Sequence, residues 1–458
     1  MAKYQKYAEY KDSGVEWLGE IPSCWKAIRL KHLILDNLVY GANEAAEDDN
    51  PNNPRYIRIT DMNSDGSLDP NTFRSLPYHI AQSYLLQDGD ILLARSGATV
   101  GKSFLFKSEF GTSCFAGYLI RARSNKSKLN PKFAYWFFQS ESYWKYVSGS
   151  QIQATIQNVS AEKYGDLYLS LPEIQDQGQI ANFLDHETAK IDTLITKQGK
   201  LIELLKEKRQ AVISHAVTKG LNPNAPMKDS GVEWLGEVPG HWTVSLIKYQ
   251  CKEITDGAHI SPELENGEHL FVSIRDIKEG IINFEDALLT SEKSYQYLVH
   301  TGCMPFEGDI LFSKDGTIGQ TAITPPNVDF VVASSLIIIR PKFSKVIPEF
   351  LDLLLRSDVV QEQVESFVKG AALRRLSIQN LLKIWGIFPP LAEQKELVDF
   401  VQLQLEKYKI LEVKAEQQVE LLRERRTALI SAAVTGKIDV CNWQHPNQKN
   451  NNNTELSA

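Results

Sequence analysis

Few residues in this sequence have the types and spacing that catalysis needs. Gly97–Lys102, GATVGK, resembles a shortened phosphate-binding loop, but it is too short for a Walker A motif, and the related segment GTIGQ lacks the lysine. Phe388–Leu391, FPPL, lacks the leading polar residue with which an adenine methyltransferase holds its target amine. His79, His215 and His259 belong to no HxxxH or HExxH group. We therefore predict no catalytic residue, bound cofactor or metal, and interpret GATVGK as a structural turn.

Length and composition describe a folded protein with more than one domain. The chain has 458 residues, 43% of them hydrophobic and 10% aromatic, which implies roughly two to four domains. Its five cysteines are far apart, and no apolar run is long enough to span a membrane. The first residues lack an apolar run, so we expect no signal peptide. We therefore expect a cytoplasmic protein. The net charge of −7 argues mildly against a nucleic-acid partner, but phosphate binding depends on the charge of one face and not of the whole chain.

The strongest pattern in the sequence is an internal repeat. Lys11–Trp25, KDSGVEWLGEIPSCW, returns as Lys228–Trp242, KDSGVEWLGEVPGHW, at an offset of 217 residues. The same offset relates Glu207–Thr218, EKRQAVISHAVT, to Glu424–Thr435, ERRTALISAAVT. The chain therefore consists of two copies of one unit, each with a globular part followed by a long helix.

The globular parts share a looser skeleton of short strands. GDILLARSGATVGK at Gly89–Lys102 corresponds to GDILFSKDGTIGQ at Gly308–Gln320, and the offset drifts to 215 and 219 before it returns to 217. Each part is predicted to be a mixed α/β (α+β) domain of about 170 residues, large enough for its own core. The expected boundaries are residues 1–175 and 223–392 for the domains, 176–222 and 393–440 for the helices, and 441–458 for a disordered tail.

Both long helices carry apolar residues at alternating steps of four and three, the heptad spacing of helices that pair with another helix. Polar residues on the first stripe, namely Glu187, Gln198 and Lys208, indicate that the register is specified at some cost in stability. Glycines after the last apolar residues predict the helix ends. The expected inter-helix packing positions are Ile180, Leu184, Ile191, Leu194, Leu201, Leu205, Leu397, Val401, Tyr408, Leu411, Leu422 and Leu429.

Matched helices with near-identical flanks can lie antiparallel, and the two domains are then related by an approximate twofold axis. DNA also has twofold axes between its strands, so such a protein could present two domains to two half-sites. About 44 residues at 1.5 Å per residue give roughly 65 Å, enough to hold two domains apart. Because the domains diverge while their frame is repeated, we expect the two half-sites to differ.

The combined motifs resemble those of a known family. The KDSGVEWLGEIP opening, the GDIL turn with its glycines, the LP…DQ and FPPLAEQ segments before the long helices, and the duplication itself are together similar to the specificity subunit of a type I restriction-modification system. The resemblance extends to about Val440. It implies two target-recognition domains, each reading one half of a split, asymmetric DNA sequence across a non-specific spacer.

The resemblance also implies partners. The helices would form an antiparallel coiled coil and dock two methyltransferase subunits, to which restriction-translocase subunits are added. Catalysis would lie in these partners, which would use S-adenosylmethionine, ATP and magnesium, and the chain itself would bind none of them. Two alternatives remain: a stand-alone methyltransferase or nuclease with fused recognition domains, and a coiled-coil scaffold that binds no DNA.

Residues that contact DNA are expected among Arg, Lys, Asn and Gln side chains in loops at matching places of the two copies. Long polar side chains precede a shared Val/Leu-Ser step in both copies, and others lie near the shared strand-turn elements. The candidates are Gln151, Gln153, Gln157, Lys369, Arg374 and Arg375, followed by Arg58, Arg95, Lys102, Arg275 and Lys314. The shared pairs Asp61 with Asp276 and Asp90 with Asp309 are interpreted as turn or scaffold residues instead, because a position that reads sequence should differ between the domains.

Overall fold

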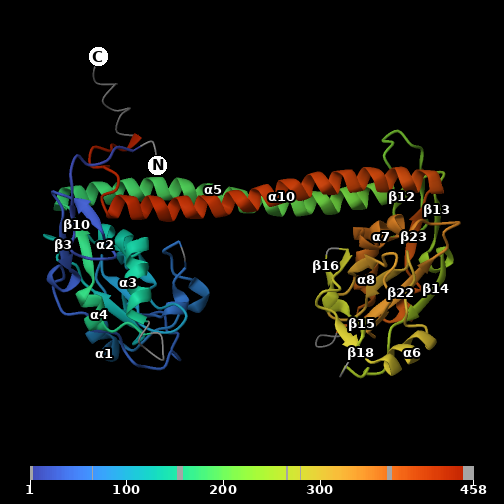
Figure 1. Cartoon of the computed structure of the whole chain (residues 1–458), viewed down its shortest axis with the longest axis horizontal. Coiled ribbons are helices and arrows are strands. Elements are labelled where there is room, and N and C mark those ends of the chain that lie inside the picture. Colours follow the sequence, from blue (N-terminus) through green and yellow to red (C-terminus); the bar gives the residue numbers. More distant parts are fainter. Residues whose placement is uncertain are drawn as a thin grey trace, which may run out of the picture. The chain divides into compact units, whose positions relative to one another are not determined.

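The computed structural model describes residues 4–63, 65–151, 158–264, 267–278, 280–368 and 374–446. The chain forms two compact units: unit 1 contains residues 1–198 and 417–458, and unit 2 contains residues 199–416. Each unit combines one globular domain with part of each of the two long helices (Figure 1). Within the described residues, no helix combines the length and the apolar character that crossing a membrane requires.

The domain of unit 1 is built on a four-stranded antiparallel sheet in the order β4-β9-β6-β7, beside a parallel pair β5-β8, an antiparallel pair β3-β10 and an N-terminal hairpin β1-β2. The strands are β1 (Tyr10–Asp12), β2 (Glu20–Pro22), β3 (Lys26–Arg29), β4 (Val39–Tyr40), β5 (Arg55–Ile57), β6 (Ile91–Ala94), β7 (Ser103–Leu105), β8 (Ser113–Phe115), β9 (Leu119–Ala122) and β10 (Tyr168–Leu171). The helices are α1 (Tyr78–Ala81), α2 (Pro131–Phe137), α3 (Glu141–Gln151), α4 (Ala161–Asp166) and α5 (Ile174–Lys219), with 3-10 turns η1 (Leu30–His32), η2 (Ile59–Asp61), η3 (Pro70–Thr72), η4 (Gln82–Tyr84) and η5 (Ser108–Phe110).

Unit 2 repeats this plan. Its four-stranded sheet has the order β14-β22-β19-β20, β15 pairs in parallel with β21, β13 pairs with β23, and β11-β12 is the hairpin. The strands are β11 (Met227–Asp229), β12 (Glu237–Pro239), β13 (Thr243–Leu246), β14 (Cys251–Asp256), β15 (His269–Val272), β16 (Ile277–Lys278), β17 (Ile281–Ile282), β18 (Leu288–Thr290), β19 (Ile310–Ser313), β20 (Thr321–Ile323), β21 (Phe330–Val332), β22 (Leu336–Pro341) and β23 (Trp385–Phe388). The helices are α6 (Glu292–His300), α7 (Pro348–Arg356), α8 (Asp358–Phe367), α9 (Ile378–Leu381) and α10 (Leu391–Val434), with 3-10 turns η6 (Ile247–Gln250) and η7 (Ile274–Asp276). The predicted pair of mixed α/β domains is confirmed.

A buried glutamine joins each long helix to the domain that precedes it. Gln177 at the start of α5 accepts a hydrogen bond from the Asn130 backbone N–H at 2.8 Å and donates two, to the carbonyls of Lys128 and Pro172. Gln394 at the start of α10 makes the same three contacts, with Ile347 N–H and with the carbonyls of Lys345 and Pro389. These two residues are the glutamines of the DQ and EQ motifs. They satisfy backbone groups that burial would otherwise leave unpaired.

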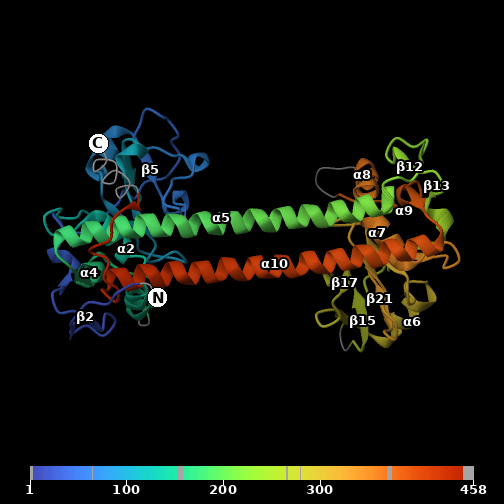
Figure 2. The same ribbon diagram turned by 90° about the horizontal axis from the view of Figure 1, so that it is seen from above.

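The long helices pack against each other in both units, and they run antiparallel there. In unit 1, Ile191 of α5 shares a core with Leu429 of α10, and Arg426 Nε lies 2.9 Å from Asp192 Oδ1. In unit 2, Val401 of α10 shares a core with Ile213 of α5. Figure 2 shows α5 and α10 from above. Gly220 and Gly436 follow the helix ends with φ of 73° each, as the sequence predicts for C-terminal caps.

The predicted inter-helix packing is correct at nine of its twelve positions and wrong at three. Nine predicted positions are buried or half-buried, but Leu194, Leu201 and Leu411 are 46%, 42% and 48% exposed. At each of these three places the next residue along the chain lies in the seam, the surface along which the two helices pack. On α5 this happens because the packed position after Ile191 is four residues further on and not three. In unit 1 the α5 positions are Leu184, Thr188, Ile191 and Ile195; in unit 2 they are Ile202, Leu205, Arg209, Val212 and Ala216.

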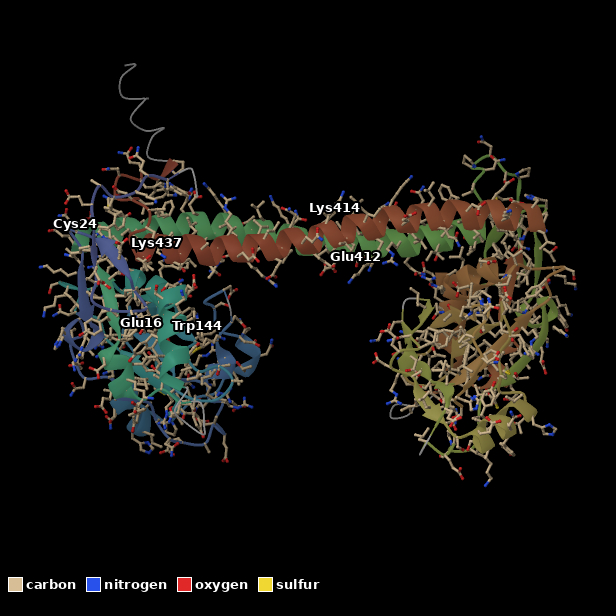
Figure 3. All side chains as sticks on the ribbon, in the orientation of Figure 1. Glu16, Cys24, Trp144, Glu412, Lys414 and Lys437 are labelled. Atoms are coloured by element: carbon tan, nitrogen blue, oxygen red, sulfur yellow. The ribbon has the colours of Figure 1, made fainter. Side chains whose placement is uncertain are left out.

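One seam position of α10 holds a buried acidic residue. The Glu412 side chain is 5% exposed, and its carboxylate lies 3.2 Å from Arg209 Nη1 and 3.7 Å from Lys206 Nζ, both on α5. Figure 3 labels Glu412 and Lys414 on opposite sides of α10. A buried carboxylate is costly unless it is paired, so any other register of the helices in unit 2 would leave Glu412 without its partners. Glu412 therefore specifies the register.

Residues 441–446, which the sequence predicts to begin a disordered tail, pack against unit 1. Trp443 packs edge-on against Phe183 of α5, with ring centroids 5.7 Å apart. The Tyr7 hydroxyl lies 3.2 Å from Cys441 Sγ. Residues 441–446 thus belong to the fold of unit 1, and the expectation of a disordered tail starting at residue 441 is wrong for them. Residues 447–458 lie outside the described part of the chain.

Two leucines on α5 test the corrected seam. Leu205 is 7% exposed and Leu201 is 42% exposed. We expect Leu205→Ala to lower the free energy of unfolding of unit 2 by about 2–4 kcal/mol, because it leaves a cavity in the seam. The matched control Leu201→Ala should cost less than about 1 kcal/mol. Urea denaturation followed by circular dichroism measures both free energies. A loss of stability for Leu201→Ala as large as that for Leu205→Ala would contradict the corrected seam.

Candidate nucleic-acid interface

Two of the predicted DNA contacts of unit 1 line one open hollow of about 720 Å³. Its wall is formed by residues that follow β4, by η2, by the turn between β6 and β7, and by residues that follow β8. Arg58 and Lys102 line it together with Asn43, Thr60 and Tyr118. Segments far apart in the sequence thus bring two of the predicted residues to one place, and a third, Arg95, lies beside them.

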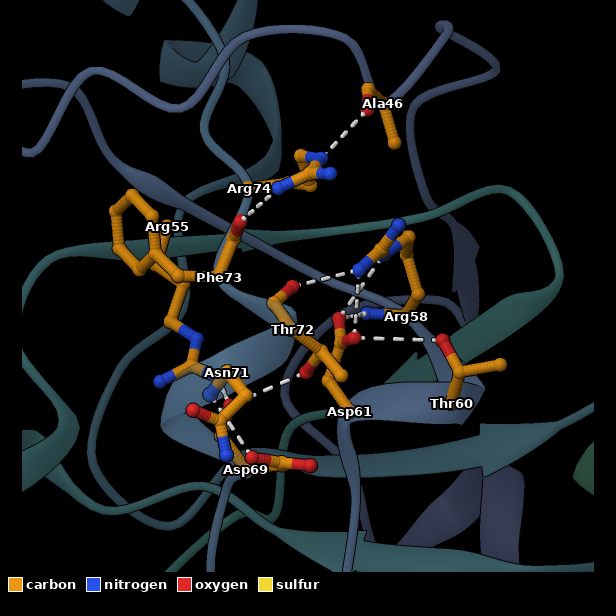
Figure 4. A network of polar contacts seen from close by, with 10 residues as sticks. All are labelled: Ala46, Arg55, Arg58, Thr60, Asp61, Asp69, Asn71, Thr72, Phe73 and Arg74. Carbon is orange, nitrogen blue, oxygen red and sulfur yellow. Dashed lines mark hydrogen bonds and ion pairs between the residues drawn. The ribbon is translucent and has the colours of Figure 1, made fainter. Parts of the chain in front are cut away.

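Arg58 is already engaged within the domain. Its guanidinium donates to the carboxylate of Asp61 through Nε at 3.1 Å and Nη2 at 2.8 Å, and Nη2 also donates to the Thr72 carbonyl at 2.7 Å. Figure 4 shows this network. The Asp61 carboxylate also accepts the Arg58 backbone N–H at 2.7 Å and caps η2. Arg58 therefore has a structural role at the edge of the hollow, since it neutralises a buried aspartate.

Lys102 and Arg95 also make contacts within the domain. Lys102 Nζ donates to the Met62 carbonyl at 2.6 Å. The Arg95 guanidinium lies over the ring of Tyr40 at 4.8 Å and reaches the Gly117 carbonyl at 3.5 Å. A guanidinium stacked on an aromatic ring keeps its outward N–H groups available. Arg95 thus remains suited to binding, whereas the ammonium of Lys102 has one carbonyl partner already.

The equivalent of Arg95 in unit 2 is Lys314. Both backbones make the same bonds: Arg95 N–H donates to the Tyr118 carbonyl and Lys314 N–H to the Ser335 carbonyl. The side chain of Lys314, however, is 3% exposed and forms an ion pair with Asp256, which stands where unit 1 has Tyr40. The prediction that Lys314 is a DNA contact is contradicted by this burial, because its ammonium neutralises a carboxylate inside the domain.

The remaining candidates of unit 2 lie at the surface. Arg275, in η7, is exposed, and within the described residues its side chain has no ion pair. Arg374 and Arg375 each expose 55% of their side chains; Arg375 Nε lies 3.1 Å from Asp315 Oδ1, and Arg374 pairs with Glu365. Such exposed pairs are weak and open readily. These three arginines are available to a phosphate or a base.

The polar loops that precede the Val/Leu-Ser step return to the same edge in both domains. Ser96 bridges Asn158 in unit 1, and Asp315 bridges Arg375 in unit 2. The predictions for the Gln151 side chain and for Gln153, Gln157 and Lys369 fall outside the described part of the chain. The structure thus places the end of each loop beside Arg95 and its equivalent, Lys314.

The shared aspartates are scaffold residues, as predicted. Asp90 binds Arg123 at 2.7 Å, and Asp309 binds Arg340 at 3.0 Å; both aspartates are 1% exposed. The hydrogen bond that Arg123 donates to Asp90 raises the pKa of Arg123. Asp61 and Asp276 both cap their 3-10 turns. Buried carboxylates fully paired in both copies leave nothing for a ligand to contact.

The sequence analysis missed Tyr118, which is 64% exposed beside the hollow. A signal was present, because Tyr118 follows the shared strand β8 by three residues and is matched by Ser335 in the other copy, whereas its neighbours are similar. Among the described side chains, no group of three or more His, Cys, Asp or Glu is placed to hold a metal ion.

Comparisons with known proteins agree with this geometry. A family model described as "Type I restriction modification DNA specificity domain" matches residues 32–205 and 248–421, once in each copy. The EcoBI specificity subunit of Escherichia coli is 23% identical over 355 residues, covering 76% of this chain and 72% of the relative. The MjaVIII specificity subunit of Methanocaldococcus jannaschii is 24% identical over 370 residues, covering 78% and 81%.

Solved structures share the fold. One, from work on complex assembly and conformational transition of the type I R-M system, has a TM-score of 0.71 at 15% identity and covers 90% of this chain and 98% of its own. The HsdS subunit from Thermoanaerobacter tengcongensis has a TM-score of 0.53 at 15% identity, with 91% and 98% covered. With a matching domain in each of its two copies, this chain belongs to the type I restriction modification DNA specificity family.

Proposed function

We propose that the two domains of this specificity subunit read the two different halves of a bipartite DNA site. The observation that carries this proposal is the contrast between frame and surface. The two domains share strand order and buried carboxylates, yet residues at the same edge differ: the exposed Tyr118 is matched by the half-buried Ser335, and the half-buried Asn158 by the exposed Arg375. Residues that read bases must differ when the bases differ, whereas those that hold the fold need not.

The long helices set the distance and the orientation between the two half-sites. Each helix runs unbroken, over 46 residues in α5 and 44 in α10, and is joined to a domain by a buried glutamine. The register specified by Glu412 resists sliding. A rigid, antiparallel connection of this kind would fix the length of the non-specific spacer in the DNA.

The helices also dock partner subunits in this proposal. Their outer faces carry exposed apolar side chains that a solitary coiled coil would not need. These are Leu194 and Leu421 in unit 1, and Leu201, Leu204, Leu403, Ile410 and Leu411 in unit 2. The partners are two methyltransferase subunits that methylate adenine, together with restriction-translocase subunits. This assembly would work in the cytoplasm, where chromosomal DNA is available.

Catalysis belongs to the partners. The methyltransferase subunits supply S-adenosylmethionine chemistry, and the restriction subunits use ATP and magnesium. The support is the sequence, which contains neither a Walker A motif nor a polar residue before its Pro-Pro pair. Methyl transfer by the purified chain alone would instead favour a stand-alone methyltransferase.

Exchanging one domain tests the two-domain proposal. Replacing residues 26–170 with the equivalent domain of a relative should change one half of the methylated sequence and leave the other half and the spacer unchanged. The reciprocal control replaces residues 243–387 and should change only the other half. Methylome sequencing of cells that carry each variant reads the result, and a variant in which both halves changed would refute separate reading by the two domains.

Surface and buried basic residues should behave differently. Arg375→Ala should weaken DNA binding about 10-fold without changing the melting temperature, because an exposed contact is removed. Lys314→Ala should lower the free energy of unfolding by about 2 kcal/mol, because Asp256 loses its buried partner. Fluorescence anisotropy of the assembled complex on its own DNA site and thermal unfolding measure the two effects. Arg375 is not a DNA contact if its replacement leaves the affinity unchanged.

A further inference from the structure

The two hairpins, β1-β2 and β11-β12, keep exposed residues identical although the fold does not require them. Twelve of the fifteen residues from Lys11 to Trp25 recur from Lys228 to Trp242. The strands pair in the same register, with Asp12 opposite Glu20 and Asp229 opposite Glu237. The two copies can therefore be compared with each other. A residue that is identical in both is needed either for the structure or for the function.

Most of the identity has a structural cause. Asp12 and Asp229 each accept the backbone N–H of the glycine two residues later at 3.0 Å, closing the turn. Lys11 and Lys228 donate to backbone carbonyls across the hairpin at 2.7 and 2.6 Å. The apolar residues between them are buried in the cores of their units, as are the tryptophans that close the motif. These contacts account for the charged ends, the glycines and the apolar positions.

Three positions are not explained in this way in both copies: Glu16, Trp17 and Glu20 in the first hairpin, with Glu233, Trp234 and Glu237 in the second. The four glutamates are exposed. Within the described part of the chain, their carboxylates make no hydrogen bond or ion pair. Figure 3 labels Glu16 on the surface of unit 1.

The tryptophan is the most informative of the three. Trp17 packs on the ring of Tyr146 in α3, with centroids 4.8 Å apart. The residue equivalent to Tyr146 in α8 is Gln363, which is 2% exposed and turns inward to bind the backbone of Trp385. Trp234 therefore lacks this aromatic contact and is 42% exposed. An exposed tryptophan present in the copy that has no such packing partner indicates an external contact.

DNA does not fit this surface. Carboxylates repel phosphates, and domains that read different half-sites have no reason to keep identical DNA contacts. A partner that binds once to each copy does fit, because the same partner needs the same surface twice. A tryptophan flanked by carboxylates suits an arginine or lysine side chain, which can stack on the indole and pair with the glutamates.

We propose that each hairpin binds one methyltransferase subunit through Glu16, Trp17 and Glu20, or Glu233, Trp234 and Glu237, against basic side chains of that subunit. This inference rests on the proposed function, because it takes the methyltransferase as the partner. It adds a defined anchor at the start of each copy to the apolar faces of the helices. One anchor at the start of each copy predicts two methyltransferase subunits for each chain.

The test uses the full chain expressed with the methyltransferase subunit from its own restriction-modification system, and native mass spectrometry counts the subunits bound. The unaltered chain should bind two. The double variant Glu233→Lys/Trp234→Ala should bind one, with affinity at that hairpin lowered about 30-fold or more. Glu16→Lys, which leaves Trp17 packed, should weaken the other hairpin. Combining all three changes should leave the chain without stable methyltransferase.

Glu362→Lys is the matched control. Glu362 is exposed on α8, and the first copy has Lys145 at the equivalent position, so this reversal of charge should leave two subunits bound. Circular dichroism confirms that each variant is folded. If the unaltered chain binds no methyltransferase, the proposed function itself fails. If it binds two and the hairpin variants also bind two with unchanged affinity, the hairpin proposal is overturned and the proposed function stands.

Discussion

A buried glutamine at the start of each long helix is the contact on which the arrangement of each unit depends. The side-chain amides of Gln177 and Gln394 each bind three backbone groups. Two of these, an N–H and a carbonyl, lie in the preceding domain, and the third is the carbonyl of the proline just before the long helix. Rotation of the helix relative to its domain would leave these buried groups unpaired, at a cost of about 1–3 kcal/mol each. The helix direction is therefore fixed by the domain that precedes it.

The seam between α5 and α10 carries that constraint further. Each helix contributes residues to the core of both units. Both cores therefore depend on the packing of α5 against α10. Glu412 with Arg209 and Asp192 with Arg426 add charge pairs that match in only one register. The side chains at the edge that carries Arg95 and its equivalent can differ between the domains without changing this backbone. Arg95 stacked on Tyr40 and Lys314 paired with Asp256 are two side-chain solutions on one backbone.

Much of this organisation could be predicted from the sequence, because the repeat compares the chain with itself. The two mixed α/β domains, the two helices, the glycine caps and the scaffold role of Asp61 and Asp90 all follow from positions that match. The helix register was harder. Leu194 and Ile195 are both apolar, as are Leu201 and Ile202, so the spacing alone does not decide which of them faces the seam; burial in the structure does.

Side-chain partners were the other gap. Lys314 looks like any basic residue beside a turn until Asp256, 58 residues earlier, is found next to it. Arg58 similarly forms an ion pair with Asp61. Trp443 packs on Phe183 across most of the chain length, and its polar neighbours in the sequence conceal this. Such contacts depend on tertiary proximity, which composition and periodicity do not contain. The roles of the exposed arginines and of Tyr118 in DNA recognition stay predictions.

The most direct test of the central claim is the methylome of cells with and without this gene. Two different domains joined by the paired long helices predict a gene-dependent adenine methylation motif with two short, unequal specific parts, separated by a spacer of constant length and no preferred sequence. A single uninterrupted motif, a spacer of variable length, or a methylome that does not change when the gene is removed would contradict the account.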